Sequence, residues 1–152
     1  MEKIEFKITI NASAVKVWDV LFGVKTYPRW TAVFAEGSQV KTDWKKGSKA
    51  LFHDDKGDGM LAIINENIPN KYMSVKHIGQ IMDGKETLHD WGESFENYTL
   101  NEKDGKTELL IDMDITKEWL DYFKETWPKA LDKVKEIAEK QHDHIETYKT
   151  AL

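Results

Sequence analysis

The stretch KIEFKITINASAVKVWDVLFG, residues 3–23, decides the fold class because its hydrophobic period changes part-way along. Over residues 3–10 apolar and polar side chains alternate, which is the pattern of a half-buried strand. Capping side chains follow, and apolar residues then recur every three or four positions until Gly23. The stretch therefore predicts a strand followed directly by a short amphipathic helix.

The middle of the chain predicts a sheet. Tyr27-Pro28-Arg29-Trp30 first predicts a second short helix, because proline suits a first helical turn and tryptophan can anchor it. From residue 36 onward, clusters of turn residues recur at short intervals. The segments between them predict strands at residues 39–43, 50–54, 60–68, 72–79, 87–101 and 107–114. Hairpin-length connections make neighbouring strands antiparallel, so we expect a curved sheet of about seven strands, with the first and last adjacent.

The chain ends in a long helical pattern that begins near residue 117 and continues into the 140s. Its apolar stripe consists of Trp119, Tyr122, Phe123, Trp127, Leu131, Val134, Ala138 and Ile145. Pro128 lies inside the pattern and lacks an N–H group, so it predicts a kink or a restart. The whole order of elements indicates an α+β fold in which a curved sheet holds one long helix.

Composition narrows the class of protein. A chain of 152 residues fits one domain spanning residues 1–152. A net charge of −5 argues against nucleic acid as a partner. The lack of cysteine excludes disulfides and thiolate chemistry. The charged N-terminal strand does not resemble a signal peptide, and no apolar run is long enough to span a membrane, so we expect a cytoplasmic protein.

Segments of packing and turn residues recur in an order that resembles a known superfamily. They are the N-terminal strand, AVKVWDVL (14–21), YPRW (27–30), EGS (36–38), WKKGS (44–48), residues 59–72, ENYTL (96–100), DGKTEL (104–109) and WPKAL (127–131). Together they cover nearly the whole chain and resemble the START/SRPBCC (Bet v-like) superfamily, especially its branch of activators of heat-shock-protein-90 ATPase homologues. The resemblance implies a helix-grip fold, in which a seven-stranded antiparallel sheet surrounds a long C-terminal helix.

The predicted geometry leaves a cavity. A strongly curved sheet cannot contact a helix along its full length, so space remains between the sheet, the short helices and the long helix. Proteins similar to this chain bind hydrophobic small molecules, lipids or polyketides, and a few carry out catalysis in the same cavity. The candidate ligand-binding residues are Trp30, His53, His77, Glu96, Tyr98, Trp119, Tyr122, Phe123 and Trp127.

These candidates have two interpretations. The aromatic side chains suit an ordinary core as well as a cavity wall. His77 alternates with Met73 and Val75 and should point inward, either as a hydrogen-bonded core histidine or as a polar anchor for a ligand. His53 carries the same ambiguity. Glu96 should point inward with Tyr98 or lie at the mouth of the cavity.

Other chemical sites are disfavoured, and we assign no catalytic residue, metal or cofactor. No Ser or Asp lies in a triad context. Residues 54–59 (DDKGDG) superficially resemble a calcium loop but lack its terminal glutamate, and they fit a hairpin turn better. His142 and His144 are two apart on a helix and point in different directions. Glu93 should face away from Glu96, because three-residue spacing on a strand reverses the face.

Three functions remain open. The first is binding of a small apolar or amphipathic ligand in the cavity, without covalent chemistry. The second is an enzyme of the cyclase or aromatase kind, whose polar groups transfer protons to a hydrophobic substrate. The third is a protein-interaction role similar to that of a chaperone ATPase activator, which predicts an exposed apolar patch.

Overall fold

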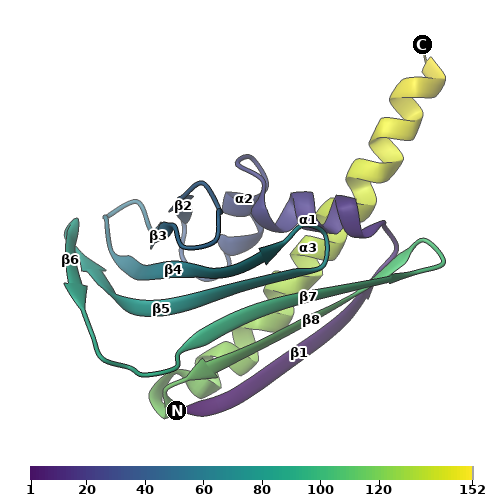
Figure 1. Cartoon of the computed structure of the whole chain (residues 1–152). Helices are drawn as coiled ribbons and strands as arrows, with labels where there is room; N and C mark the ends of the chain where they lie inside the picture. Colours follow the sequence, from purple (N-terminus) through teal and green to yellow (C-terminus); the bar gives the residue numbers. More distant parts are fainter. Residues whose placement is uncertain (152) are drawn as a thin grey trace.

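The structure is a computed structural model that describes the backbone of residues 1–151 and the side chains of residues 1–140. The elements in chain order are β1 (Glu2–Ile10), α1 (Ala14–Phe22), α2 (Tyr27–Thr31), β2 (Gln39–Lys41), β3 (Lys49–His53), β4 (Gly59–Ile68), β5 (Tyr72–Met82), β6 (Lys85–Leu88), β7 (Phe95–Lys103), β8 (Lys106–Ile115) and α3 (Lys117–Ala151). Figure 1 shows α3 crossing one face of the sheet, with α1 and α2 beside it. The predicted helix-grip fold is confirmed.

The sheet is antiparallel throughout, in the order β1-β8-β7-β5-β4-β3-β2. The first strand pairs with the last along its whole length, from Glu2 opposite Ile115 to Ile10 opposite Thr107. The sheet's two edges are therefore β1 and β2. Two register shifts in the β4–β5 pair, at Leu61/Ala62 and Ile64/Glu66, are the irregularities that bend strands and increase their twist.

The predicted strand at residues 87–101 is wrong in extent, because the structure divides it into β6 and β7. β6 pairs only with β5 and lies off the main strand path. Gly92 in the intervening loop has a φ of 63°, a left-handed conformation that a continuous strand does not contain. The predicted path of seven strands is present, and β6 is a short additional strand that pairs with β5.

Local chemistry explains the two short helices. The Ser13 side chain accepts a hydrogen bond from the Lys16 backbone N–H at 3.2 Å and caps α1. Gly23 ends α1 where an added Cβ would lie 2.4 Å from the Asp19 carbonyl oxygen, so only glycine fits there. Pro28 occupies the first turn of α2, as predicted.

Helix α3 passes through Pro128 as one element, so the predicted restart does not occur. Its stripe is buried in the middle, where Trp127, Leu131, Val134 and Ala138 are at most 3% exposed. At its beginning Trp119 is 53% exposed and Tyr122 is 39% exposed, and Ile145 lies outside the described side chains. Within the described residues, no helix is both long and apolar enough to cross a membrane.

Candidate ligand-binding site

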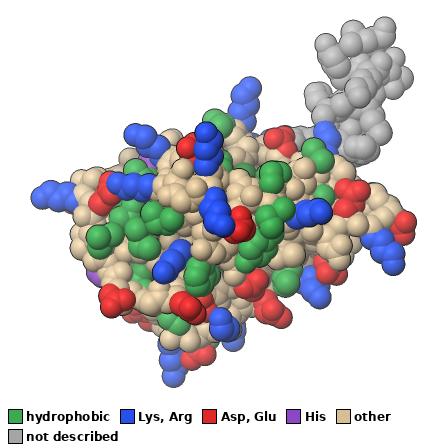
Figure 2. Space-filling view, viewed as in Figure 1, with side chains coloured by type: hydrophobic (Ala, Val, Ile, Leu, Met, Phe, Trp, Pro, Cys, Tyr) green, Lys and Arg blue, Asp and Glu red, His purple; other side chains and the backbone are tan. Residues whose placement is uncertain are grey.

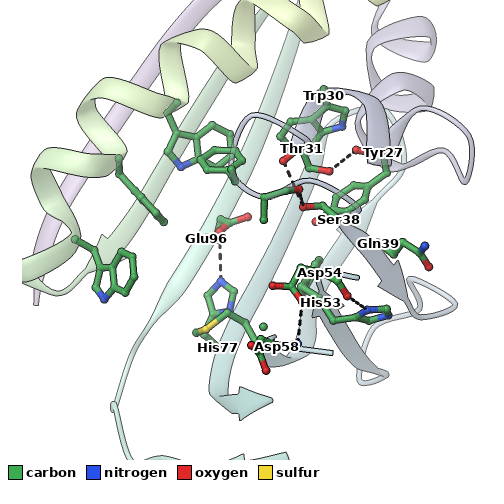
Figure 3. Close-up of a pocket in the computed structure, with 18 of the residues that line it drawn as sticks. Tyr27, Trp30, Thr31, Ser38, Gln39, His53, Asp54, Asp58, His77 and Glu96 are labelled. Atoms are coloured by element: carbon green, nitrogen blue, oxygen red, sulfur yellow. Dashed lines mark hydrogen bonds and ion pairs between the residues drawn. The ribbon is translucent and has the colours of Figure 1, made fainter. Parts of the chain in front are cut away.

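A cavity of about 390 Å³ lies between the sheet and the helices α2 and α3. Helix α3 packs against β1, α1 and α2, whereas the bent strands β3, β4 and β5 curve away from it. The space left between α3 and these strands is the cavity. Figure 3 shows side chains from α2, β3, β5 and β7 converging on it.

Aromatic side chains form much of the cavity wall. They are Tyr27, Trp30, Phe34, Phe52, Tyr98, Trp119, Tyr122, Phe123 and Trp127. Trp127 is central to this set, with its ring 5.0 Å from Phe34, 5.9 Å from Trp30 and 6.3 Å from Tyr98, centroid to centroid. Edge-to-face and offset contacts are the arrangements that aromatic pairs prefer, and they stabilise the packing of these rings. The rings give the wall its apolar part, beside polar lining residues that include Ser38, His53 and Asp54.

A second cavity of about 420 Å³ adjoins the first on the side of Met1 and the β6–β7 loop. Five residues line both cavities: Met60, His77, Glu96, Trp119 and Phe123. The two cavities therefore share part of their wall.

A polar cluster faces this shared region. Tyr98 donates a hydrogen bond from its hydroxyl to Glu96 Oε2, and His77 Nε2 lies 3.3 Å from Glu96 Oε1. Figure 3 shows His77 and Glu96 pointing toward one another. Both side chains are mostly buried, at 15% and 18% exposure. The pairing follows from strand order, because β5 and β7 are neighbours with Val75 opposite Glu96.

Burial by itself would raise the pKa of Glu96, but the hydrogen bond and charge of His77, with the hydrogen bond from Tyr98, outweigh it. The pKa of Glu96 is held below its ordinary value, so this carboxylate is ionised at neutral pH. Burial, followed by the Glu96 charge, raises the pKa of both Tyr98 and Tyr27, so both remain neutral phenols. The cavity thus holds a buried carboxylate that is paired with His77 and hydrogen-bonded by the neutral Tyr98 hydroxyl.

This pKa predicts an acid-sensitive contribution to stability. A carboxylate with a depressed pKa in the folded state stabilises the fold above its unfolded pKa of about 4.3, and that stabilisation disappears as pH falls through the folded value. Between about pH 5 and pH 3, Glu96→Gln should therefore show a shallower fall in unfolding free energy than the unmodified protein. Urea denaturation at each pH measures this, and parallel profiles would contradict the assignment.

All nine predicted site residues line the first cavity, although not at the same depth. Trp30, Tyr98 and Trp127 are buried, whereas Trp119 and Tyr122 lie at the mouth. His53 lies at the end of β3, where its Nδ1 is 2.9 Å from the Asp54 carbonyl oxygen. That they contact a ligand stays a prediction.

Several other expectations have structural outcomes. Residues 54–58 form a turn between β3 and β4, and the Asp54 carboxylate accepts the backbone N–H groups of Lys56 and Asp58. The sequence predicted that Glu93 and Glu96 lie on the same strand, and this is wrong. Glu93 lies in the exposed loop before β7. The side chains of His142 and His144 lie outside the described residues.

Among the lining residues that sequence reasoning missed are four with large apolar or aromatic side chains: Tyr27, Phe34, Phe52 and Met60. Phe52 directly precedes His53, and strict alternation would put only one of them inward. Both line the cavity because His53 ends the strand at a turn. Tyr27 could have been found from its position in the predicted second helix, one turn from Trp30.

A family model for "Activator of Hsp90 ATPase homolog 1-like protein" matches residues 11–139. The match takes in both short helices, the sheet from β2 to β8 and most of α3. The chain belongs to this family. The sequence resemblance to that branch of the superfamily is confirmed, and a search of curated proteins gives no significant match.

Solved structures show the same fold in other members of this structural class. Protein MLL2253 from Mesorhizobium loti is 15% identical with a TM-score of 0.73, and the alignment covers 91% of this chain and 98% of that one. The Aha1 dimer from Colwellia psychrerythraea is 20% identical with a TM-score of 0.72, covering 91% and 97%. CalU16 from Micromonospora echinospora is 16% identical with a TM-score of 0.65, covering 96% and 82%. At these identities the likeness concerns the fold alone.

Proposed function

We propose that this protein binds a small apolar or amphipathic molecule in the cavity between its sheet and α3. The observation that supports this best is the cavity of about 390 Å³, lined by nine aromatic side chains and by the buried polar group of His77, Glu96 and Tyr98. Ligand sites in proteins are typically 300–1,000 Å³, mostly apolar, with a few polar groups that fix orientation. The volume and the mixture of aromatic and polar lining residues agree with such a site.

Part of the buried core lies outside the cavity wall. Its fully buried members include Ile10, Val17, Leu21, Leu109, Ile111 and Val134, which belong to the same core cluster as the cavity-lining Trp30, Tyr98 and Trp127. The cavity lies at the other end of α3, where Trp119 and Tyr122 are exposed. The buried residues of the cavity wall thus contribute to the core, and the exposed residues at its mouth leave the space accessible.

Native mass spectrometry of freshly purified protein tests this proposal. Gentle desolvation should show a fraction of the protein carrying an extra mass of a few hundred daltons, which denaturing conditions remove. The apo protein should also bind a lipophilic dye with increased dye fluorescence. An apo mass together with no dye binding would contradict the proposal.

A second function, proton transfer to a bound substrate, is supported by the convergence of His77, Glu96 and Tyr98. An ionised carboxylate paired with an imidazole can accept and return a proton within a cavity that limits access of water. Such an enzyme would exchange deuterium from heavy water into an acidic C–H bond of its co-purified ligand. Glu96→Gln should abolish that exchange, and an equal rate without protein would exclude it.

A protein partner is the third proposal, and family membership is its main support. Figure 2 shows, on the face in view, apolar side chains in separate patches with lysine, arginine and acidic side chains between them. The exposed large apolar residues among the described side chains lie on many different elements, from Val15 and Val24 to Met82 and Leu88. This distribution favours the cavity over the outer surface as the main binding region.

A further inference from the structure

We infer that the ligand carries a protonated amine on an apolar body. This inference rests on the proposed function, and it assigns the charge of the ligand from the charges around the cavity. Glu96 is a mostly buried carboxylate that lines both cavities. Among the described residues, neither cavity is lined by a lysine or an arginine. A fatty acid or another anionic amphiphile would meet no lysine or arginine side chain among these lining residues.

The Glu96 carboxylate has unused capacity to accept hydrogen bonds. An ionised carboxylate offers about four acceptor positions on its two oxygens. Within the described structure, Tyr98 donates to one oxygen and His77 Nε2 lies 3.3 Å from the other. The remaining positions belong to a side chain that lines both cavities. An ammonium group is a three-fold donor, so it would satisfy them better than a hydroxyl group.

The aromatic wall itself favours a cation. Ring faces carry negative charge and attract ammonium groups lying within about 6 Å of the ring centroid. The Tyr98 hydroxyl donates a hydrogen bond to Glu96. The centroid of the Tyr98 ring lies 6.3 Å from that of Trp127 and 5.2 Å from that of Phe22. A cation bonded to Glu96 would lie beside the Tyr98 hydroxyl, and its apolar body would contact the aromatic side chains that line the same cavity.

The mouths of the cavities carry negative charge, as Glu96 does. Asp54 and Asp58 line the first cavity at the β3–β4 turn, and Asp114 and Glu118 line the second. The basic groups among the lining side chains are His53, His77 and His89, and Lys3 pairs with Asp114 from an exposed position. Clefts lined mostly by one sign of charge concentrate ligands of the opposite sign. A chain with a net charge of −5 would attract a cation from solution.

Isothermal titration at pH 7 with three matched probes tests the inference: decylammonium, decanol and decanoate. All three have the same alkyl chain, so they differ only in the charge of the head group. We expect decylammonium to bind at least tenfold more tightly than decanol, and decanoate to bind more weakly than either. Glu96→Gln should reduce decylammonium affinity about tenfold and decanol affinity by much less, so that the preference for decylammonium over decanol is largely lost.

Glu5→Gln is the charge-matched control, because Glu5 is exposed on β1 and its loss changes the net charge equally. It should leave all three affinities unchanged. Equal affinities for the three probes, or equal effects of the two variants, would overturn the inference while leaving ligand binding intact. Failure of all three probes to bind would count against the proposed function itself. If Glu96→Gln fails to fold, the order of the three probe affinities on the unmodified protein still tests the inferred charge of the ligand.

Discussion

Replacing Trp30 with alanine is expected to lower the free energy of unfolding by about 3–5 kcal/mol, the usual cost of removing a large aromatic from a core. Trp30 is 1% exposed, and its Nε1 donates a hydrogen bond to the Leu21 carbonyl oxygen at 3.1 Å. The ring also lies edge-on to Tyr27 and close to Trp127. One side chain thus connects α1, α2 and α3. Urea denaturation followed by circular dichroism measures the loss.

The matched control is Trp119→Ala, which removes the same side chain from an exposed position. Trp119 is 53% exposed at the mouth of the cavity, so we expect a loss of less than about 1 kcal/mol. Equal losses for the two variants would show that Trp30 does not have the connecting role that its contacts imply.

Met60→Trp is expected to weaken binding of decanol about a hundredfold. Met60 lines both cavities, so a larger side chain there should obstruct the space that they share. Excluding three or four methylene groups of the probe, at about 0.8 kcal/mol each, removes about 3 kcal/mol of binding free energy. Isothermal titration measures the change.

Met82→Trp provides the control with the same change at an exposed position, since Met82 is 59% exposed at the end of β5. Its affinity for decanol should equal that of the unmodified protein. If Met60→Trp also kept full affinity while remaining folded, the probe would have to bind elsewhere, and the cavity would lose its assigned role.

The sequence predicted the architecture because each element carries a clear hydrophobic period. The alternation in β1 and the turn clusters between the later strands are local signals that need no knowledge of the tertiary structure. The division of residues 87–101 into two strands was missed because these signals are only local. Alternation can continue across a bend, and the left-handed backbone at Gly92 is not visible in a periodic pattern.

The candidate site was only partly predictable. Alternation with Met73 and Val75 indicated that His77 points inward, and the same reasoning put Glu96 on the face of Tyr98. Their contact with each other depends on register, because a one-residue slip between β5 and β7 would turn one side chain outward. No local pattern determines that register. The second cavity was equally hidden, since Met1, Trp91 and Thr116 meet there from distant parts of the sequence.

The most direct test of the central claim is a nuclear magnetic resonance measurement of the protein with decanol bound. Intermolecular nuclear Overhauser effects report contacts between the methylene protons of the probe and protein side chains. The account predicts such effects to the rings of Tyr98, Phe123 and Trp127, which line the first cavity. Effects confined to exposed residues such as Val15, Val24 and Leu88, with none to these rings, would contradict it.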